Sequence, residues 1–310
     1  MSTAVTLDRL GVFQHRYTGR DELTDFARWV DERGFGNLWL NEPGLVRDPL
    51  IDASAAAVLT ERVGIAIGLS NIWRSLPAVL ASQVATLERL APARLTMTIG
   101  PWHEPQATLA GATRHDNLAA MRDTTEIVRR LLTGGQASYD GSVFSTHDAT
   151  LGVPPPTAPV PLLWGVVRPR MLEAAGQHAD GVMINYLHST ARVAATIETV
   201  RASAKTAGRD PDELQFPAAV LMRVDEDRDG ALEFVRGIVD QTALLRHEAN
   251  IPDGHAVTTE DVEAWAVVGP PEECAARLQA YLDAGATSLG IVVMGPARDS
   301  LEPVLAALSL

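Results

Sequence analysis

Two side chains that can take part in proton transfer or ligand binding stand directly after apolar runs of the sequence. His103 can donate or accept a proton near neutral pH, and the alternative role for it is that of a loop histidine with structural hydrogen bonds only. Glu42 follows the run 37–41, where a carboxylate needs a partner such as the polar edge of a ligand ring. We predict that His103 and Glu42 are the catalytic residues.

The segment that begins at Gly165 combines the features of an anion-binding site. The glycine ends an apolar run, and Pro169 suits the first position of a helix, so free backbone N–H groups would face a ligand beside Arg168. The alternative is a turn glycine followed by a solvent-exposed arginine. We predict that a phosphate group binds here, through Gly165, Val166, Val167 and Arg168.

Tryptophan, amide and imidazole side chains dominate the other positions that follow apolar runs. Such a set suits a planar ligand between aromatic and apolar walls, and we predict substrate contacts for Trp73, Trp102 and His188. The alternative for both tryptophans is packing over an apolar core. A metal-dependent hydrolase is disfavoured, because His15, His103 and His188 are not accompanied by paired carboxylates. We therefore expect no metal.

These candidate residues fall at one end of the expected fold. Short apolar runs alternate with amphipathic segments, which predicts an α/β protein with a single (β/α)8 TIM barrel, whose site is built from the residues after the strands. An open dinucleotide-binding sheet is disfavoured because residues 12–16 contain no glycine-rich motif. The expected strands are 10–13, 37–41, 63–69, 95–99, 162–165, 181–185, 216–224 and 288–293.

An insertion is expected after the fourth strand. It contains a helix over 117–132 and then a hairpin at Asp140-Gly141, a pair of residues typical of a tight turn. A connector with five prolines between Ala149 and Val167 completes it. Those prolines exclude a membrane-spanning helix in this uncharged stretch.

Composition narrows the class of protein. The 310 residues are 46% hydrophobic and have a net charge of −13, which indicates a globular chain of one large domain or two smaller ones and disfavours nucleic acid or an anionic membrane as the partner. The eight alternating strand and helix units favour the first of these, a single domain over residues 1–310. Cys274 is the only cysteine and no signal peptide is visible, so we expect a cytoplasmic protein. Lys205 is the only lysine among the 26 basic residues, which favours a bacterial source with GC-rich codons.

Five segments in order along nearly the whole chain resemble the luciferase-like monooxygenase superfamily, and within it the oxidoreductases that use coenzyme F420, a deazaflavin. The resemblance implies hydride transfer between the deazaflavin and a small organic substrate in the barrel mouth, and a homodimer formed through barrel helices. The segments are 32–42 (ERGFGNLWLNE), 56–68 (AAVLTERVGIAIG), 83–94 (QVATLERLAPAR), 169–181 (PRMLEAAGQHADG) and 268–285 (VGPPEECAARLQAYLDAG).

The resemblance also implies a set of cofactor-binding residues. By position, Ile67 and Gly68 would form a bulge, often with a non-prolyl cis peptide, behind the deazaflavin ring. Ser70 and Asn71 follow this bulge, and Gly100 matches the start of the family's glycine-rich loop after the fourth strand. These residues and the segment 165–168 are the expected cofactor contacts.

Two departures from the family pattern bear on the substrate. The sugar-phosphate dehydrogenases of this family carry an acid followed by histidine after the second strand, where this sequence has Glu42-Pro43, and a loop glycine where it has Pro101-Trp102. The stretch 70–73 resembles a less characterised actinobacterial branch of F420-dependent oxidoreductases instead. The alternatives to this assignment are an FMN-dependent monooxygenase of the same fold and a non-catalytic protein that binds flavin or deazaflavin.

Overall fold

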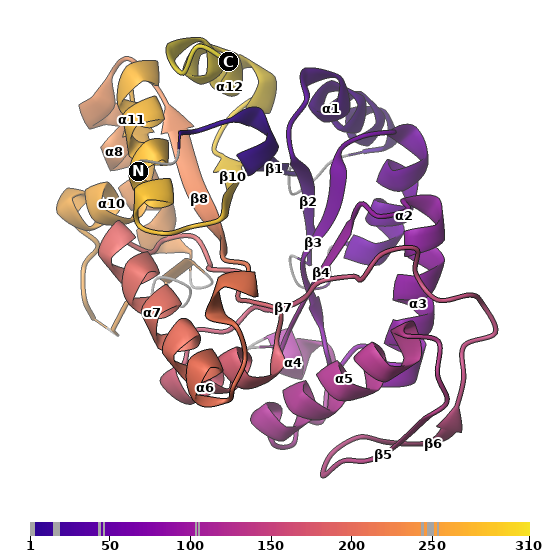
Figure 1. Ribbon diagram of the computed structural model, residues 1–310. Helices are drawn as coiled ribbons and strands as arrows, with labels where there is room; N and C mark the ends of the chain where they lie inside the picture. Colours follow the sequence, from indigo (N-terminus) through magenta and orange to yellow (C-terminus); the bar gives the residue numbers. More distant parts are fainter. Residues whose placement is uncertain are drawn as a thin grey trace.

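The computed structural model describes residues 4–14, 19–42, 45, 47–102, 104, 106–242, 245–246, 251–252 and 254–310. A parallel sheet of eight strands runs in the order β7-β4-β3-β2-β1-β10-β8-β9, and helices lie outside it in two arcs (Figure 1). The strands are β1 Leu10–Phe13, β2 Asn37–Asn41, β3 Gly64–Asn71, β4 Leu95–Gly100, β7 Leu162–Trp164, β8 Pro217–Val224, β9 Val267–Gly269 and β10 Ser288–Val293.

The segment 181–184 links the two halves of this sheet. Isolated parallel bridges join Trp164 of β7 to Val182, and Ile184 to Ala218 of β8. The strands therefore form a ring in the order β1, β2, β3, β4, β7, 181–184, β8 and β10, and β10 pairs with β1. The expected (β/α)8 barrel is confirmed, with β9 as an additional short strand beside the carboxyl end of β8.

Helices follow the strands because of local sequence signals. Gly34 takes a left-handed conformation (φ +87°) and ends the first helix, so the chain turns into β2. The side chains of Asp48 and Asp116 accept hydrogen bonds from the first free amides of the second helix and of the long helix after β4. The helices are α1 Arg20–Arg33, α2 Pro49–Leu59, α3 Pro77–Leu90, α4 Gln106–Leu109, α5 Asn117–Leu132, α6 Pro169–His178, α7 Thr190–Thr206, α8 Arg228–Gln241, α10 Thr259–Trp265, α11 Pro271–Asp283 and α12 Ala297–Ala307.

Two helices near the end of the chain are elements that the sequence analysis did not predict. The first of them is α10, over Thr259–Trp265. A capping box between Thr258 and Asp261 starts α10, a signal that the analysis of periodicity missed. The last helix, α12, was also not expected; it follows Gly295-Pro296 and contains Pro303, which interrupts a helical pattern.

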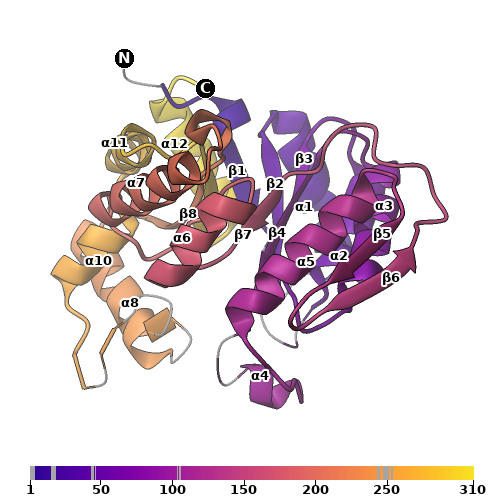
Figure 2. The same cartoon turned by 60° about the horizontal axis from the view of Figure 1, so that its bottom comes forward.

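The insertion after β4 packs against the outside of the barrel. After α4 and α5, the strands β5 (Ala137–Asp140) and β6 (Ser145–Ala149) form the expected hairpin. The Asp123 carboxylate on α5 holds this hairpin, because it accepts hydrogen bonds from the Tyr139 hydroxyl and from the amides of Val143 and Phe144. Figure 2 places α4 and α8 at the end of the molecule opposite the two termini.

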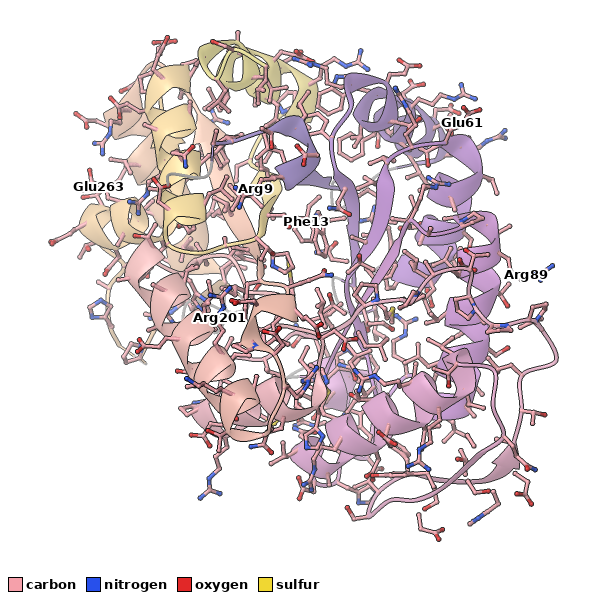
Figure 3. The ribbon with its side chains drawn as sticks, in the orientation of Figure 1. Arg9, Phe13, Glu61, Arg89, Arg201 and Glu263 are labelled. Carbon is pink, nitrogen blue, oxygen red and sulfur yellow. The ribbon has the colours of Figure 1, made fainter. Side chains whose placement is uncertain are left out.

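Aromatic rings fill the interior of the ring of strands. Phe13 lies near the centre of the barrel (Figure 3) and stacks on Trp39, with ring centroids 5.6 Å apart. Gly11 and Gly290 make room for them, since a Cβ atom at either position would come within 2.7 Å of one of these rings. The barrel is therefore a packed core, not a channel. Within the described ranges, no helix has both the length and the apolar character needed to cross a membrane.

Candidate functional site

A large cavity opens at the carboxyl ends of the barrel strands. Its volume is about 1260 Å³, enough for a ligand the size of a cofactor. Strands from all sides of the ring contribute to its wall, so this is the barrel mouth in which a site is expected. On the strand ends or directly after them lie Phe13, Gln14, Asn41, Glu42, Gly68, Leu69, Asn71, Gly165, Val166, Val167, Arg168, Met183, Asn185, Ala219, Leu221, Val292 and Val293.

Glu42, at the end of β2, joins three parts of the wall. One carboxylate oxygen accepts a hydrogen bond from the Trp102 indole at 2.9 Å. The other accepts the Asn71 amide and forms an ion pair with Arg74, each at 3.1 Å. The Glu42 side chain is only 1% exposed, and burial raises its pKa despite the nearby Arg74 guanidinium. This group, the Glu42 cluster (Glu42, Asn71, Arg74 and Trp102), fixes the loops after β2, β3 and β4 to one another.

A bulge in β3 shapes the adjoining part of the wall. The pairing register shifts after Ile67 on both sides of β3, which places the irregularity at Gly68 and Leu69. A Cβ atom on Gly68 would lie 2.7 Å from the Phe13 ring, so only glycine leaves this surface open. Asn71, three residues further, lines the cavity and is 2% exposed, and its side-chain nitrogen has no hydrogen-bond partner. An open backbone surface and an unpaired amide thus lie on the same strand.

The predicted phosphate segment lies at the start of α6. Arg168 is the N-cap residue of this helix, Pro169 is its first residue, and no side chain caps it. Among the described residues, the amides of Val167 and Arg168 donate no backbone hydrogen bond. Both residues are exposed and line the cavity. This geometry offers an anion free N–H groups and a guanidinium together.

Trp73 and Trp102 occupy different places around the site. Trp102 lines the main cavity and also a smaller neighbouring cavity of about 530 Å³, which contains Arg47 and Arg74. Trp73 lines only the smaller one, where its indole donates to the Asn117 side chain at 3.1 Å. Trp102, but not Trp73, therefore borders both cavities.

Five of the described predicted site residues do not line the main cavity, and Trp73 is one of them. Ile67, Ser70 and His188 are each at most 3% exposed and pack into the protein, and Gly100 lies beneath Gly165, where a Cβ atom would be 2.9 Å from the Gly165 oxygen. His188 lies outside both cavities, contrary to the expected substrate contact. Burial lowers its pKa to about 4, and neither ring nitrogen has a partner. Its position after an apolar strand gave no information on which way the side chain would point.

His103 lies outside the described residues, as do His15 and Arg16. Its predicted part in proton transfer stays a prediction.

Gln14 is a cavity residue that the sequence analysis missed. It directly follows β1, and its backbone N–H donates to the Trp39 carbonyl at 2.9 Å. The side chain is 4% exposed, yet neither its oxygen nor its nitrogen has a hydrogen-bond partner. The available signal was its place immediately after the first apolar run, 10–13.

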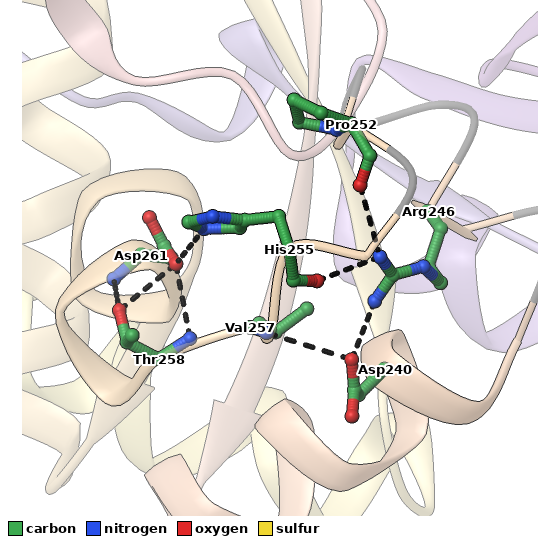
Figure 4. Close-up of polar contacts among 7 residues, drawn as sticks. All are labelled: Asp240, Arg246, Pro252, His255, Val257, Thr258 and Asp261. Carbon is green, nitrogen blue, oxygen red and sulfur yellow. Dashed lines mark hydrogen bonds and ion pairs between the residues drawn. The ribbon is translucent and has the colours of Figure 1, made fainter.

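A second polar cluster lies beside the part of the wall that follows α8. Arg246 pairs with Asp240 and donates to the carbonyl of His255 at 2.7 Å, and His255 faces Asp261 at 3.4 Å (Figure 4). Leu245, the neighbour of Arg246, lines the main cavity. This Arg246 cluster (Asp240, Arg246, His255 and Asp261) therefore fastens Pro252, His255 and Val257 close to the cavity edge.

Comparisons with known proteins agree with this architecture. The chain is 25% identical over 292 residues to 5,10-methylenetetrahydromethanopterin reductase of Methanolobus tindarius, covering 86% of this chain and 89% of that protein. It is 27% identical over 303 residues to F420-dependent glucose-6-phosphate dehydrogenase of Kineococcus radiotolerans, covering 90% and 88%. The structure of coenzyme F420 dependent tetrahydromethanopterin reductase from Methanopyrus kandleri superimposes with a TM-score of 0.81 at 21% identity, over 96% of each chain, and so shares the fold.

A family model described as luciferase-like monooxygenase matches residues 2–288, which is most of the sequence. The chain belongs to the luciferase-like monooxygenase family.

Proposed function

We propose that this protein is an oxidoreductase that transfers a hydride between coenzyme F420 and a small organic substrate bound in the main cavity. The observation that carries the proposal is the pairing of the Gly68 bulge with the free N–H groups at Arg168 in one cavity. The name of one relative, the F420-dependent glucose-6-phosphate dehydrogenase of Kineococcus radiotolerans, supports the same cofactor. We further propose that one barrel domain spans the chain.

The residues of the cavity fit this cofactor. The segment 165–168 would hold its phosphate, because a helix N-terminus and a guanidinium both attract anions. The open surface at Gly68 would lie behind its flat ring, and the unpaired Asn71 nitrogen would donate to a polar atom on the ring edge. When bound, coenzyme F420 supplies the carbon that takes up or releases the hydride.

The remaining groups position the ligands and handle protons. Glu42 keeps Asn71 and Trp102 in place and contributes a buried carboxylate to the cavity wall. His103 is proposed as the residue that exchanges the substrate proton. Phe13, Leu221 and the other apolar wall residues exclude water from the reacting atoms.

A binding titration with oxidised coenzyme F420 and, separately, with FMN tests the cofactor. Wild-type protein is expected to bind the deazaflavin at micromolar concentration or below and to bind FMN more weakly. Arg168→Ala should weaken binding about 10- to 150-fold, as expected for the loss of a charged hydrogen bond worth about 1.5–3 kcal/mol. Tighter binding of FMN would support the monooxygenase instead, and binding of neither cofactor would refute the proposal.

We also propose a homodimer that forms through the barrel helices α2 and α3. Large apolar side chains are exposed there at Ile51 (70%), Val58 (66%), Leu76 (65%) and Val79 (48%). The mass in solution measured by light scattering tests this, since a monomer at micromolar concentration would contradict it.

A further inference from the structure

Gln14 lies in the cavity at a point that the cofactor assignment does not use. In the ring of strands β1 and β7 are opposite one another, with three strands between them on either side. Gln14 therefore lies across the barrel mouth from the anion-binding segment 165–168, and the Gly68 bulge on β3 lies between the two. A cofactor anchored at Arg168 with its ring against Gly68 leaves the β1 side of the cavity for a second molecule.

The Gln14 amide is unusual because it is buried and unsatisfied. Both of its polar atoms lack a partner although the side chain is 4% exposed and lines the cavity. Unpaired buried amides reduce folding stability and are rare in native proteins, so each one needs an explanation. Unlike His188, Gln14 lines the cavity, where a bound molecule can supply the missing partner. The terminal torsion of glutamine has broad minima, and a small rotation presents the amide to a bound molecule.

The charges around Gln14 restrict that molecule. Along the strand-end wall the described polar neighbours are amides, namely Asn41, Asn71 and Asn185. The charged members of this wall are Arg168, which is assigned to the cofactor phosphate, and Glu42, whose two oxygens are occupied by Trp102, Asn71 and Arg74. Two further arginines line the cavity, but Arg114 is paired with Glu104 and Arg298 lies over the Trp29 ring, 5.6 Å from its centroid. Glu22, Asp25 and Asp299 line the cavity as well, and these acidic side chains disfavour a carboxylate or phosphate of the substrate. The surroundings therefore favour a neutral polar group.

We propose that Gln14 is a specificity-determining residue that hydrogen-bonds the oxygen of a neutral alcohol or carbonyl substrate. The amide has a donor and an acceptor, so it matches both redox forms, because a carbonyl oxygen accepts and a hydroxyl group also donates. The proposal rests on the proposed function and names its substrate class. It assigns a substrate contact to the side of the cavity opposite the phosphate segment.

The variant Gln14→Met separates this role from a structural one. Methionine has a similar length and no unpaired polar atoms, so the melting temperature of the ligand-free protein should rise by about 2–5 °C. Gln177→Met is the matched control, because Gln177 is exposed and donates only to Ser203 at 3.3 Å. The control should melt within about 1 °C of wild type. A fall in the melting temperature of Gln14→Met would mean that the amide supports the fold.

Substrate preference is measured on the F420-loaded protein with a panel of neutral alcohols and ketones, carboxylates and sugar phosphates. Wild type should prefer the neutral compounds, and Gln14→Met should lower kcat/KM for them about tenfold or more. The Kd for F420 should change less than twofold. Equal kcat/KM in both proteins, or a weakened Kd for F420 with unchanged kcat/KM, would overturn the proposal.

The two proposals fail in different ways. If wild type binds neither cofactor, the proposed function fails, and the panel is then measured as ligand-induced shifts of the melting temperature without cofactor. The substrate contact would still be supported if neutral compounds shift the melting temperature of wild type but do not shift that of Gln14→Met. Shifts only by carboxylates or phosphates, or no shifts at all, would contradict it.

Discussion

The Glu42 cluster and the Arg246 cluster fasten different parts of the cavity edge by different means. The Glu42 side chain is 1% exposed and each of its oxygens has a partner on another loop. The Arg246 and Asp240 side chains are 22% and 36% exposed, and His255 is 50% exposed. Buried charges depend strongly on their partners, whereas exposed pairs contribute little to stability. The comparison indicates that the Glu42 cluster holds its loops more strongly than the Arg246 cluster holds the segment after α8.

Removal of the Glu42 carboxylate should have the largest effect. Glu42→Ala leaves Arg74, the Asn71 amide and the Trp102 indole without this partner, and we expect the free energy of unfolding to fall by about 2–4 kcal/mol. Urea denaturation followed by circular dichroism measures this loss. A loss below about 1 kcal/mol would remove the contrast between the two clusters.

Glu42→Gln is the matched control, since it keeps an acceptor for Trp102 but not the charge. Burial raises the pKa of Glu42, so the folded protein takes up this proton at a higher pH than the unfolded chain does. The contribution of this group to stability therefore falls as pH rises from the unfolded value of 4.5 through the raised pKa. The glutamine variant should lack that part of the pH dependence.

The sequence predicted the barrel more completely than the site. Strands such as Gly64–Asn71 are nearly continuous apolar runs, and burial on both faces of a parallel barrel requires that pattern. The direction of a side chain just after a strand depends on the turn that follows. His188 follows Leu187, which has a left-handed conformation (φ +62°), and the imidazole is buried outside the cavity. Gln14 was missed because an amide carries no chemical signal until its partners, or their absence, are known.

The Glu42 cluster and the Arg246 cluster differ both in burial and in the side of the barrel on which they lie. His188 can show which of these two differences determines how much a group contributes to stability. It lies on the same half of the ring as the Arg246 cluster, after residues 181–184, but is 3% exposed. Burial lowers its pKa from 6.5 to about 4, so the stability that the neutral ring provides is present above pH 6.5 and is lost as pH falls towards 4.

Between pH 7 and pH 5 the wild type should lose about 2 kcal/mol of unfolding free energy through His188, and His188→Met should not show this part of the loss. His147, whose side chain is 78% exposed on the hairpin, is the control, and His147→Asn should keep the wild-type dependence. Urea denaturation at both pH values gives the comparison. If His188→Met loses as much unfolding free energy between pH 7 and pH 5 as wild type does, burial of His188 does not determine the acid sensitivity of this half of the barrel.

The Arg246 cluster should show the smallest effect on stability and a clear effect on ligand release. Arg246→Met removes a partly exposed ion pair and the contact with the His255 carbonyl, so the free energy of unfolding should fall by about 0.5–1 kcal/mol. The neighbouring Leu245 lines the cavity, so the dissociation rate of F420 in stopped-flow experiments should rise several-fold. Arg236→Met, which removes the exposed pair with Glu233 on α8, is the control and should change neither quantity measurably. If F420 dissociates from Arg246→Met and Arg236→Met at the same rate, the Arg246 cluster does not control the release of the cofactor. The two clusters would then differ only in their contribution to stability.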